Sequence, residues 1–282
     1  QNGIYDLQLV ALDINGKTTS INSVIVVDGD MKLGNYSISF EDVNVPLAGI
    51  PIRVTRTYDT RQKSQKLDFG YGWSVDYQNV RVQESRKLGF SWNLNYYRSG
   101  FFGKYCVEPS GNPIVTITLP DGSVERFKAK ANPDCTQLVP TIDVGITFEP
   151  QGSTRSTLEQ TDYGNLRLAN GNIIDMGDEL TMENGVDPNA YKLTTKDGMV
   201  YFLDQAFGIR KIQEPGGQTI TYTSGGIKHS LGYEIKFERD SNNRITALLL
   251  PDGRKVSYSY NANGDLTSVT DLSGNITHFA YQ

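Results

Sequence analysis

Residues 253–281 read GRKVSYSYNANGDLTSVTDLSGNITHFAY, and they continue a pattern that begins 21 residues earlier. Glycine recurs at this period, and so do aromatic residues in the segments between the glycines. The positions that define the pattern are Gly232, Phe237, Gly253, Tyr258, Tyr260, Gly264, Leu266, Val269, Gly274, Phe279 and Tyr281. A fixed period of about 20–50 residues is typical of chains that stack one small unit on the next. Because such stacks build large continuous surfaces, the pattern favours a scaffold over a compact enzyme.

Each unit of this repeat is predicted to be a β-hairpin. Val256, Tyr258 and Tyr260 alternate with polar residues, as expected for a strand with one buried face. Leu266 and Val269 follow after a turn and lie three positions apart. The same gap separates Ile245 from Leu248 and Ile209 from Ile212. Residues three apart on a regular strand point to opposite faces, so we expect a β-bulge that turns both toward the core.

The remaining sequence also predicts strands, and no convincing helical period is found. Turn sequences such as LPDG recur at residues 119–122 and 250–253. Near the beginning, residues 4–11 and 21–27 flank a turn at 13–16 and predict a hairpin. We interpret this hairpin as the end of an immunoglobulin-like domain, that is, a partial β-sandwich. The predicted fold is therefore all-β, with antiparallel hairpins that pair edge to edge.

Composition bounds the function. The formal net charge of −5 argues against nucleic acid as a partner, since nucleic-acid binding needs a basic surface. No apolar stretch approaches the roughly 20 residues that span a bilayer.

Cys106 and Cys135 either form one disulfide or remain two partly buried thiols, and the sequence leaves both alternatives open. Both ends resemble interrupted structural units, so we expect the chain to be a piece of a longer polypeptide.

Few residues suggest chemistry. His229 and His278 are the chain's two histidines, and neither lies in a metal-ligand motif. Residues 13–16 and 28–30 carry clustered oxygen ligands that suit calcium, but turn formation explains them better. Asp175, Asp178 and Glu179 could serve glycoside hydrolysis, although a solvated acidic loop is the simpler interpretation. We therefore predict no enzymatic activity, no cofactor and no bound metal.

Aromatic residues form a second cluster upstream of the repeats. Its members are Tyr71, Trp73, Trp92, Tyr96, Tyr97, Phe101 and Phe102. If exposed, such rings would offer a platform for carbohydrate, whereas buried rings would build a core at roughly 1.5–3 kcal/mol for each large side chain. We expect them to be buried.

The repeat pattern resembles the RHS or YD-repeat family. The residues that match the family consensus are Gly253, Tyr258, Tyr260, Gly264, Leu266, Val269, Asp271 and Gly274. The Tyr-Asp pair that names the repeat is replaced by Tyr260-Asn261 in one unit and by Arg239-Asp240 in the preceding one. Residues 45–59 and 69–74 resemble the segment that opens the RHS region of large bacterial secreted proteins.

The resemblance implies a domain plan and a function. Residues 1–29 would end an immunoglobulin-like domain, 30–195 would open the RHS region, and 196–282 would form YD-type hairpins. The family implies that the antiparallel hairpins stack into a curved or spiralling sheet. This sheet would be part of a secreted or cell-surface β-shell that encloses or displays a C-terminal polypeptide, for example a toxin. The partner would then be that polypeptide or the remainder of the same chain. The alternative is a surface adhesin that binds glycan or protein through exposed aromatic residues. We also expect the isolated chain to self-associate through an open sheet edge.

Overall fold

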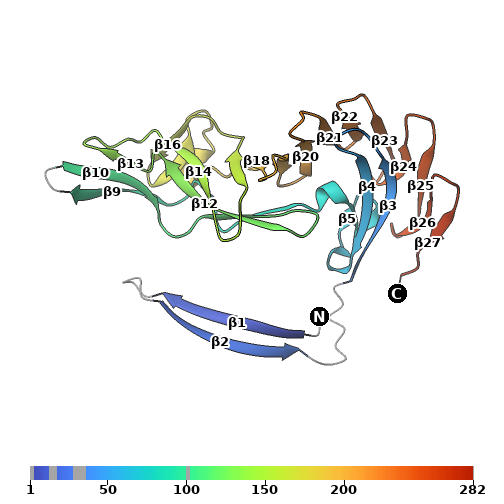
Figure 1. Ribbon diagram of the computed structural model, residues 1–282, viewed down its shortest axis with the longest axis horizontal. Helices are drawn as coiled ribbons and strands as arrows, with labels where there is room; N and C mark the ends of the chain where they lie inside the picture. Colours follow the sequence, from blue (N-terminus) through green and yellow to red (C-terminus); the bar gives the residue numbers. More distant parts are fainter. Residues whose placement is uncertain (1–2, 13–17, 28–35, 100–101, 282) are drawn as a thin grey trace.

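One antiparallel sheet of 11 strands runs through the second half of the chain (Figure 1). The computed structural model describes residues 3–12, 18–27, 36–99 and 102–281. From β18 onward, strands that are neighbours in the sheet are also neighbours in the sequence, which confirms the predicted pairing of successive hairpins. In sheet order, the strands are β15 (Thr157–Gln160), β18 (Ala190–Thr194), β19 (Val200–Asp204), β20 (Gly208–Gln213), β21 (Thr219–Thr223), β22 (Gly226–His229), β23 (Glu234–Arg239), β24 (Ile245–Leu249), β25 (Lys255–Tyr260), β26 (Leu266–Thr270) and β27 (Ile276–His278).

The predicted β-bulges are present in this sheet. Between β25 and β26 the register shifts at Ser259 and Tyr260, so that Tyr258 lies opposite Val269 and Tyr260 lies opposite Leu266. Equivalent shifts occur between β23 and β24 and between β19 and β20. The extra residue changes the direction of the strand, and both Leu266 and Val269 are consequently buried.

The turns between hairpins require glycine at one position. Gly253 and Gly274 adopt φ angles of +85° and +86°, in the left-handed region that other L residues rarely occupy. Their backbone N–H groups donate to the carbonyl oxygens of Leu250 and Asp271 at 3.0 and 3.1 Å. The 21-residue recurrence of glycine therefore reflects one turn geometry repeated along the sheet.

A second layer covers one face of this long sheet, and two smaller antiparallel sheets from the first half of the chain form it. One contains β3 (Ser37–Val45), β4 (Ile52–Asp59) and β7 (Trp73–Val75). The other contains β8 (Arg81–Glu84), β11 (Ile114–Thr118), β12 (Val124–Asn132) and β14 (Gly145–Pro150). We call residues 36–84, from the first of these sheets through β8, the opening segment.

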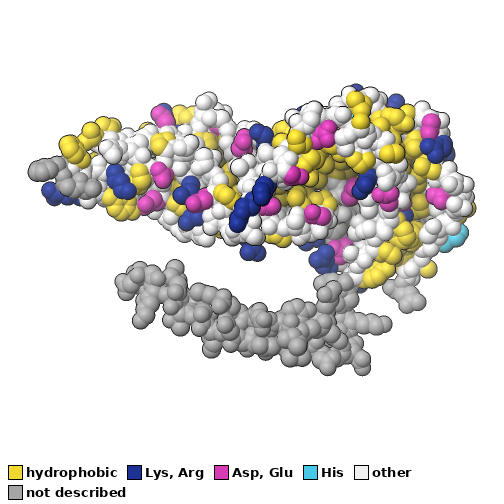
Figure 2. Space-filling model, in the orientation of Figure 1, with side chains coloured by type: hydrophobic (Ala, Val, Ile, Leu, Met, Phe, Trp, Pro, Cys, Tyr) yellow, Lys and Arg dark blue, Asp and Glu magenta, His cyan; other side chains and the backbone are white. Residues whose placement is uncertain are grey.

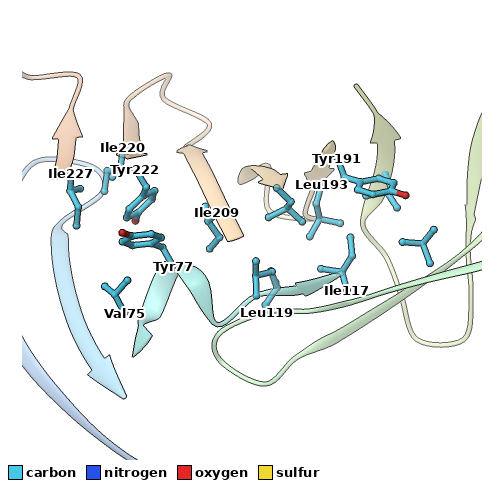
Figure 3. Close-up of a cluster of buried hydrophobic side chains, with 14 of the residues drawn as sticks. Val75, Tyr77, Ile117, Leu119, Tyr191, Leu193, Ile209, Ile220, Tyr222 and Ile227 are labelled. Carbon is cyan, nitrogen blue, oxygen red and sulfur yellow. The ribbon is translucent and has the colours of Figure 1, made fainter. Parts of the chain in front are cut away.

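A continuous hydrophobic core joins the two layers. Figure 3 shows Tyr77 beside Tyr222, and Leu119 facing Ile209 across the space between the layers. The rings of Tyr77 and Tyr222 lie 4.8 Å apart, centroid to centroid. On the opposite face of the long sheet the strands carry mainly polar and charged side chains, as in β23, where Glu234, Lys236 and Glu238 are exposed. The long sheet is therefore buried on one face and polar on the other.

The remaining elements are short. A three-stranded arm consists of β9 (Trp92–Ser99), β10 (Phe102–Pro109) and β13 (Cys135–Gln137), and it lies at the far end of the molecule from β27 (Figure 1). Two small hairpins pair β5 (Lys66–Leu67) with β6 (Gly70–Tyr71) and β16 (Leu166–Ala169) with β17 (Asn172–Asp175). Helical structure in the described residues is limited to η1 (Thr60–Gln62), η2 (Asp76–Gln78) and α1 (Thr181–Asn184). The predicted all-β, antiparallel fold is confirmed.

The beginning of the chain forms the predicted hairpin. Strands β1 (Gly3–Leu12) and β2 (Thr18–Val27) pair antiparallel, with Gly3 opposite Val27. The expected turn at 13–16 and the segment 28–30 lie outside the described residues. Whether the hairpin belongs to an immunoglobulin-like domain stays a prediction. The domain boundary expected at residue 196 is also a prediction, and the long sheet itself extends upstream to β15.

Candidate functional site at the junction of the two layers

A buried ion pair lies where the opening segment meets the repeats. Arg56 on β4 donates through Nε and Nη2 to the two carboxylate oxygens of Asp42 on β3, at 2.9 and 3.0 Å. The side chains are 2% and 6% exposed. Burying two charges is costly, and the bidentate geometry offsets part of that cost. Nη1 of Arg56 is buried and has no hydrogen-bond partner among the described residues.

Four aromatic rings surround the guanidinium of Arg56. Its Cζ atom lies 4.6 Å from the ring centroid of Trp73, 4.9 Å from Phe40, 5.2 Å from Phe279 and 5.9 Å from Tyr258. We call these four rings the aromatic cage. Phe40 and Trp73 come from the opening segment, whereas Tyr258 and Phe279 come from the repeats. A planar guanidinium is attracted to aromatic faces, so the Arg56 side chain stabilises the contact between the opening segment and the repeats.

Tyr258 extends the ion pair into the repeats. Its hydroxyl group donates to Oδ2 of Asp42 at 2.7 Å, across 216 residues of sequence. Burial, followed by the negative charge of Asp42, raises the pKa of Tyr258 well above its usual range, so the phenol stays protonated and remains a donor. Asp42 thus accepts hydrogen bonds from Arg56 of the opening segment and from Tyr258 of the repeats.

A second ion pair joins the layers through an atypical repeat residue. Arg239 occupies the position that holds Tyr260 one 21-residue period later. Nη1 of Arg239 forms an ion pair with Oδ1 of Asp68, and the two side chains are 14% and 8% exposed. The carbonyl oxygen of Asp68 also accepts a hydrogen bond from the backbone N–H of Ile245 at 2.7 Å. The departure from tyrosine at residue 239 therefore provides a partner for a buried carboxylate of the opening segment.

The tyrosines at the repeat position make a different contact. The hydroxyl of Tyr281 donates to the carbonyl oxygen of Leu266 at 2.7 Å, and Tyr260 donates in the same way to Ile245. Both bonds span 15 residues, so they are the same bond in successive units. The Tyr281 hydroxyl also accepts from Nε1 of Trp73 at 2.8 Å. The repeated tyrosine thus ties adjacent hairpins together and, in the last unit, reaches the opening segment.

The two layers also touch through their backbones. Gly70, at φ +90°, lies so close to Gly264 that a Cβ atom added to Gly70 would sit 2.5 Å from the carbonyl oxygen of Gly264. Phe69, the preceding residue, packs its ring 4.7 Å from that of Tyr258. This close approach requires glycine at position 70.

Most of the residues named from the repeat pattern lie in the core of the long sheet or at its turns. Phe237, Tyr258, Leu266 and Val269 are buried, and Tyr260 and Phe279 pack against the core. Gly232 and Gly264 adopt φ angles of +89° and +99° at turns. Arg56, Asp42 and Asp68 did not emerge from the sequence reasoning. A signal existed for Arg56, which lies in the same two-residue register as the buried Ile52 and Val54.

Other predicted positions lie away from this junction. Cys106 and Cys135 form a disulfide that joins β10 to β13. His229 is buried, and its Nδ1 accepts a hydrogen bond from the backbone N–H of Leu231 at 3.0 Å, whereas His278 is exposed on β27. Within the described ranges, no group of three or more His, Cys, Asp or Glu residues is placed to bind a metal ion.

The expectation of a solvated acidic loop at residues 175–179 was wrong for Asp175. This carboxylate is 8% exposed and accepts hydrogen bonds from the backbone N–H groups of Gly177 and Gly164, at 2.7 and 3.2 Å. Asp178 accepts one from the N–H of Leu180 at 3.0 Å, and Glu179 is exposed. Backbone donors replace water around Asp175, so it stabilises a turn.

Burial of the upstream aromatic cluster was predicted correctly for some members and wrongly for others. Trp73 and Trp92 are buried, and Tyr71 is half-buried. Tyr96, Tyr97 and Phe102 are 56%, 43% and 65% exposed, so the expectation was wrong for these three. They lie on the arm, which extends beyond the two layers (Figure 1). Phe101 lies outside the described residues.

Comparison with known proteins supports the interpretation of the repeats. Residues 239–281 match the family model described as RHS Repeat, a range that covers β24 to β27. No curated protein matches the chain. In the part of the chain that the structure describes, no helix is both long and apolar enough to cross a membrane. RHS repeats indicate a structural role in a secreted or cell-surface protein. The match and the stacked, bulged hairpins support the interpretation of residues 239–281 as repeats of the RHS/YD type.

Proposed function

We propose that this chain is the beginning of a β-walled container that encloses a polypeptide belonging to the same protein. The observation that carries the proposal is the junction described above, where the opening segment is fixed across one face of the hairpin sheet by buried ion pairs. A sheet that is covered on one face and polar on the other is suited to close the end of a container wall, because neither face exposes a large apolar surface. In this role the chain acts by covering and positioning, without a catalytic step.

The junction gives the wall its starting point. A stack of hairpins has no intrinsic first member, because each hairpin can pair with another on both sides. Arg56 and Asp68 contact residues of particular repeats, namely Tyr258 and Arg239, so the opening segment docks in a single register. We propose that this register sets where the wall begins.

The β27 edge of the sheet, beside the junction, provides the direction of growth. Among the described strands, β27 pairs only with β26, and its side chains are exposed. An unpaired strand edge recruits further strands. We propose that the partner there is further sequence of the same polypeptide. An isolated chain of 282 residues would use the same edge to self-associate.

The disulfide supports a location outside the reducing cytosol. Bonds such as Cys106–Cys135 persist in oxidising compartments and at cell surfaces. We propose secretion or surface display as the setting of the container. A toxic segment is one class of enclosed polypeptide that fits this setting.

Limited proteolysis of the complete natural polypeptide tests the proposal. The segments that follow the repeats are expected to resist protease in the intact protein and to be cut rapidly when they are expressed alone. Arg56→Ala should shorten the protection by loosening the junction, whereas Arg53→Ala, on the exposed face of the same strand, should leave it unchanged. Equal cleavage rates for the enclosed and the free segment would refute the container.

A further inference from the structure

One face of the arm carries a row of polar and aromatic side chains that no contact with the main body accounts for. Strand pairing places Tyr97 opposite Lys104 and Lys104 opposite Gln137. Two-residue alternation adds Asn95 and Phe102 to the same face. Tyr97, Phe102, Lys104 and Gln137 are exposed. We call this surface the Tyr97 face.

The opposite face of the arm has a different chemistry. It carries Leu94, Tyr96 and Tyr105, and the rings of the two tyrosines lie 5.0 Å apart. The ring of Tyr96 lies against Gly103, where an added Cβ atom would come within 2.2 Å of it. This face therefore carries mainly aromatic and aliphatic groups, with Leu94 and Tyr96 exposed, whereas the Tyr97 face carries mainly polar groups. Figure 2 shows hydrophobic and charged side chains side by side at this end of the molecule.

Hydrogen bonds order the Tyr97 face. Oε2 of Glu108 accepts bonds from the Tyr97 hydroxyl at 2.6 Å and from Nδ2 of Asn95 at 2.7 Å. These two bonds, the Tyr97 bond first, lower the pKa of Glu108 and keep its carboxylate ionised. Nζ of Lys104 lies 5.9 Å from the centroid of the Tyr97 ring. The ring is thus held in one orientation before any ligand arrives.

Several polar atoms on this face are left for a ligand. Both bonds to Glu108 end on Oε2, and within the described ranges Oε1 accepts none. The ammonium group of Lys104 and the side-chain amide of Gln137 likewise form no hydrogen bond or ion pair with described residues. Glu108 also borders a cavity of about 340 Å³, together with Lys128, Asp134 and Cys135. This volume falls in the range of roughly 300–1,000 Å³ that is typical of small-molecule sites.

The charge balance of the face selects the ligand class. Among the described residues, Lys104 and Glu108 on this face carry opposite charges, as do Lys128 and Asp134 at the cavity, so no large net charge attracts an acidic or a basic polymer. Amide, carboxylate and ammonium groups around an exposed ring match a molecule that has hydroxyl groups on its edges and C–H groups on its faces. The disulfide between Cys106 and Cys135 fixes the two strands on which these groups stand.

We infer that the Tyr97 face binds a neutral oligosaccharide. The sugar ring stacks on Tyr97, and its hydroxyl groups bond to Oε1 of Glu108, to Lys104 and to Gln137. The sugar chain continues past Phe102 on one side and toward the cavity beside Glu108 on the other. This activity is independent of the container proposed above, because the arm takes no part in the junction of the two layers.

Binding of the 282-residue chain to a glycan array and to immobilised starch, cellulose, chitin and mannan tests the inference. The wild type should bind at least one neutral glycan, with little change between low and high salt. Tyr97→Ala should weaken binding about tenfold, a loss of about 1.4 kcal/mol. Glu108→Gln, which keeps an oxygen for Asn95 and Tyr97, should weaken binding less than Tyr97→Ala does.

The matched control is Tyr96→Ala, which removes the same residue type from the opposite face of the same strand. It should change binding less than twofold, and circular dichroism should show that all variants remain folded. Three results would overturn the inference: no binding to any neutral glycan, equal losses for Tyr96→Ala and Tyr97→Ala, or binding restricted to acidic glycans and abolished by salt. Each of these results can be distinguished from a failure of the container proposal, because the proteolysis experiment does not involve the arm.

Discussion

The phenol of Tyr258 donates a hydrogen bond to the carboxylate of Asp42 at 2.7 Å, although 216 residues separate them in the sequence. Tyr258 belongs to the repeat pattern, whereas Asp42 is the extra residue at a register shift in β3. Asp42 is itself held by Arg56. This relationship links the repeats to the opening segment within one hydrophobic core, and several consequences can be measured.

Removal of Arg56 should strongly destabilise the protein. Arg56→Ala leaves the carboxylate of Asp42 buried without its cation, which costs about 3–5 kcal/mol. Urea unfolding measures the change in free energy. Arg53→Ala is the control, because Arg53 lies on the exposed face of β4 and its 4.0 Å contact with Glu41 is worth at most about 1 kcal/mol. Similar losses for the two variants would show that the buried ion pair contributes little.

Substitution of Gly70, compared with that of Gly274, should distinguish the stability lost through a steric clash between the layers from the stability lost through a positive φ angle. Gly70→Ala places a Cβ atom 2.5 Å from the Gly264 carbonyl oxygen, whereas Gly274→Ala, at a similar positive φ, meets nothing within 4 Å. We expect Gly274→Ala to cost about 1–2 kcal/mol for its φ angle, and Gly70→Ala to cost at least twice as much. Urea midpoints of the two variants provide the comparison. A smaller loss for Gly70→Ala would mean that the layers are not in contact there.

Restoring tyrosine at residue 239 should harm this chain. Arg239→Tyr reproduces the residue found at 260 and 281 but removes the cation that pairs with Asp68. The variant should be less stable than the wild type, and adding Asp68→Asn should recover part of the loss. A double-mutant cycle is expected to give a coupling energy of about 0.5–3 kcal/mol. Purely additive effects would contradict the pairing.

Asp76 should make stability depend on pH. Burial is the largest influence on this carboxyl and raises its pKa to about 7, against an ordinary value of 3.8. Between these values the folded protein binds one more proton than the unfolded chain, so stability falls as pH rises from 4 to 7, by at most about 1.4 kcal/mol per pH unit. Unfolding free energies across this range should fall less steeply with pH in Asp76→Asn than in the wild type. Parallel profiles would show that Asp76 titrates normally.

Loss of the disulfide should loosen the arm. The bond closes a loop with a sequence separation of 29, and its removal by Cys106→Ala with Cys135→Ala should cost about 2–4 kcal/mol. Hydrogen exchange should accelerate in β9, β10 and β13 but not in β24 to β27. A reducing agent should reproduce the effect in the wild type and leave the variant unchanged. Detection of two free thiols in the unreduced, unfolded protein would exclude the bond.

The sequence determined the hairpin stack because the information is local. The 21-residue period, the alternation around Tyr258 and the three-residue gap from Leu266 to Val269 predict a bulged hairpin, since each depends on neighbours along one strand. The same features carry the resemblance to RHS repeats, which the family model matches at residues 239–281. The cysteine pair was visible as a candidate, but geometry between distant residues decided that it is bonded.

Tertiary structure decided which residues join the two layers and which aromatic residues stay exposed. Arg56, Asp42 and Asp68 look like ordinary charged residues in the sequence, and their burial depends on repeats about 170–220 residues later in the chain. Trp92 and Tyr97 lie five positions apart, yet one is buried and the other is exposed because the arm extends beyond the layers. Local pattern specifies a strand and its faces, whereas the partner of each face is set by the packing of distant segments.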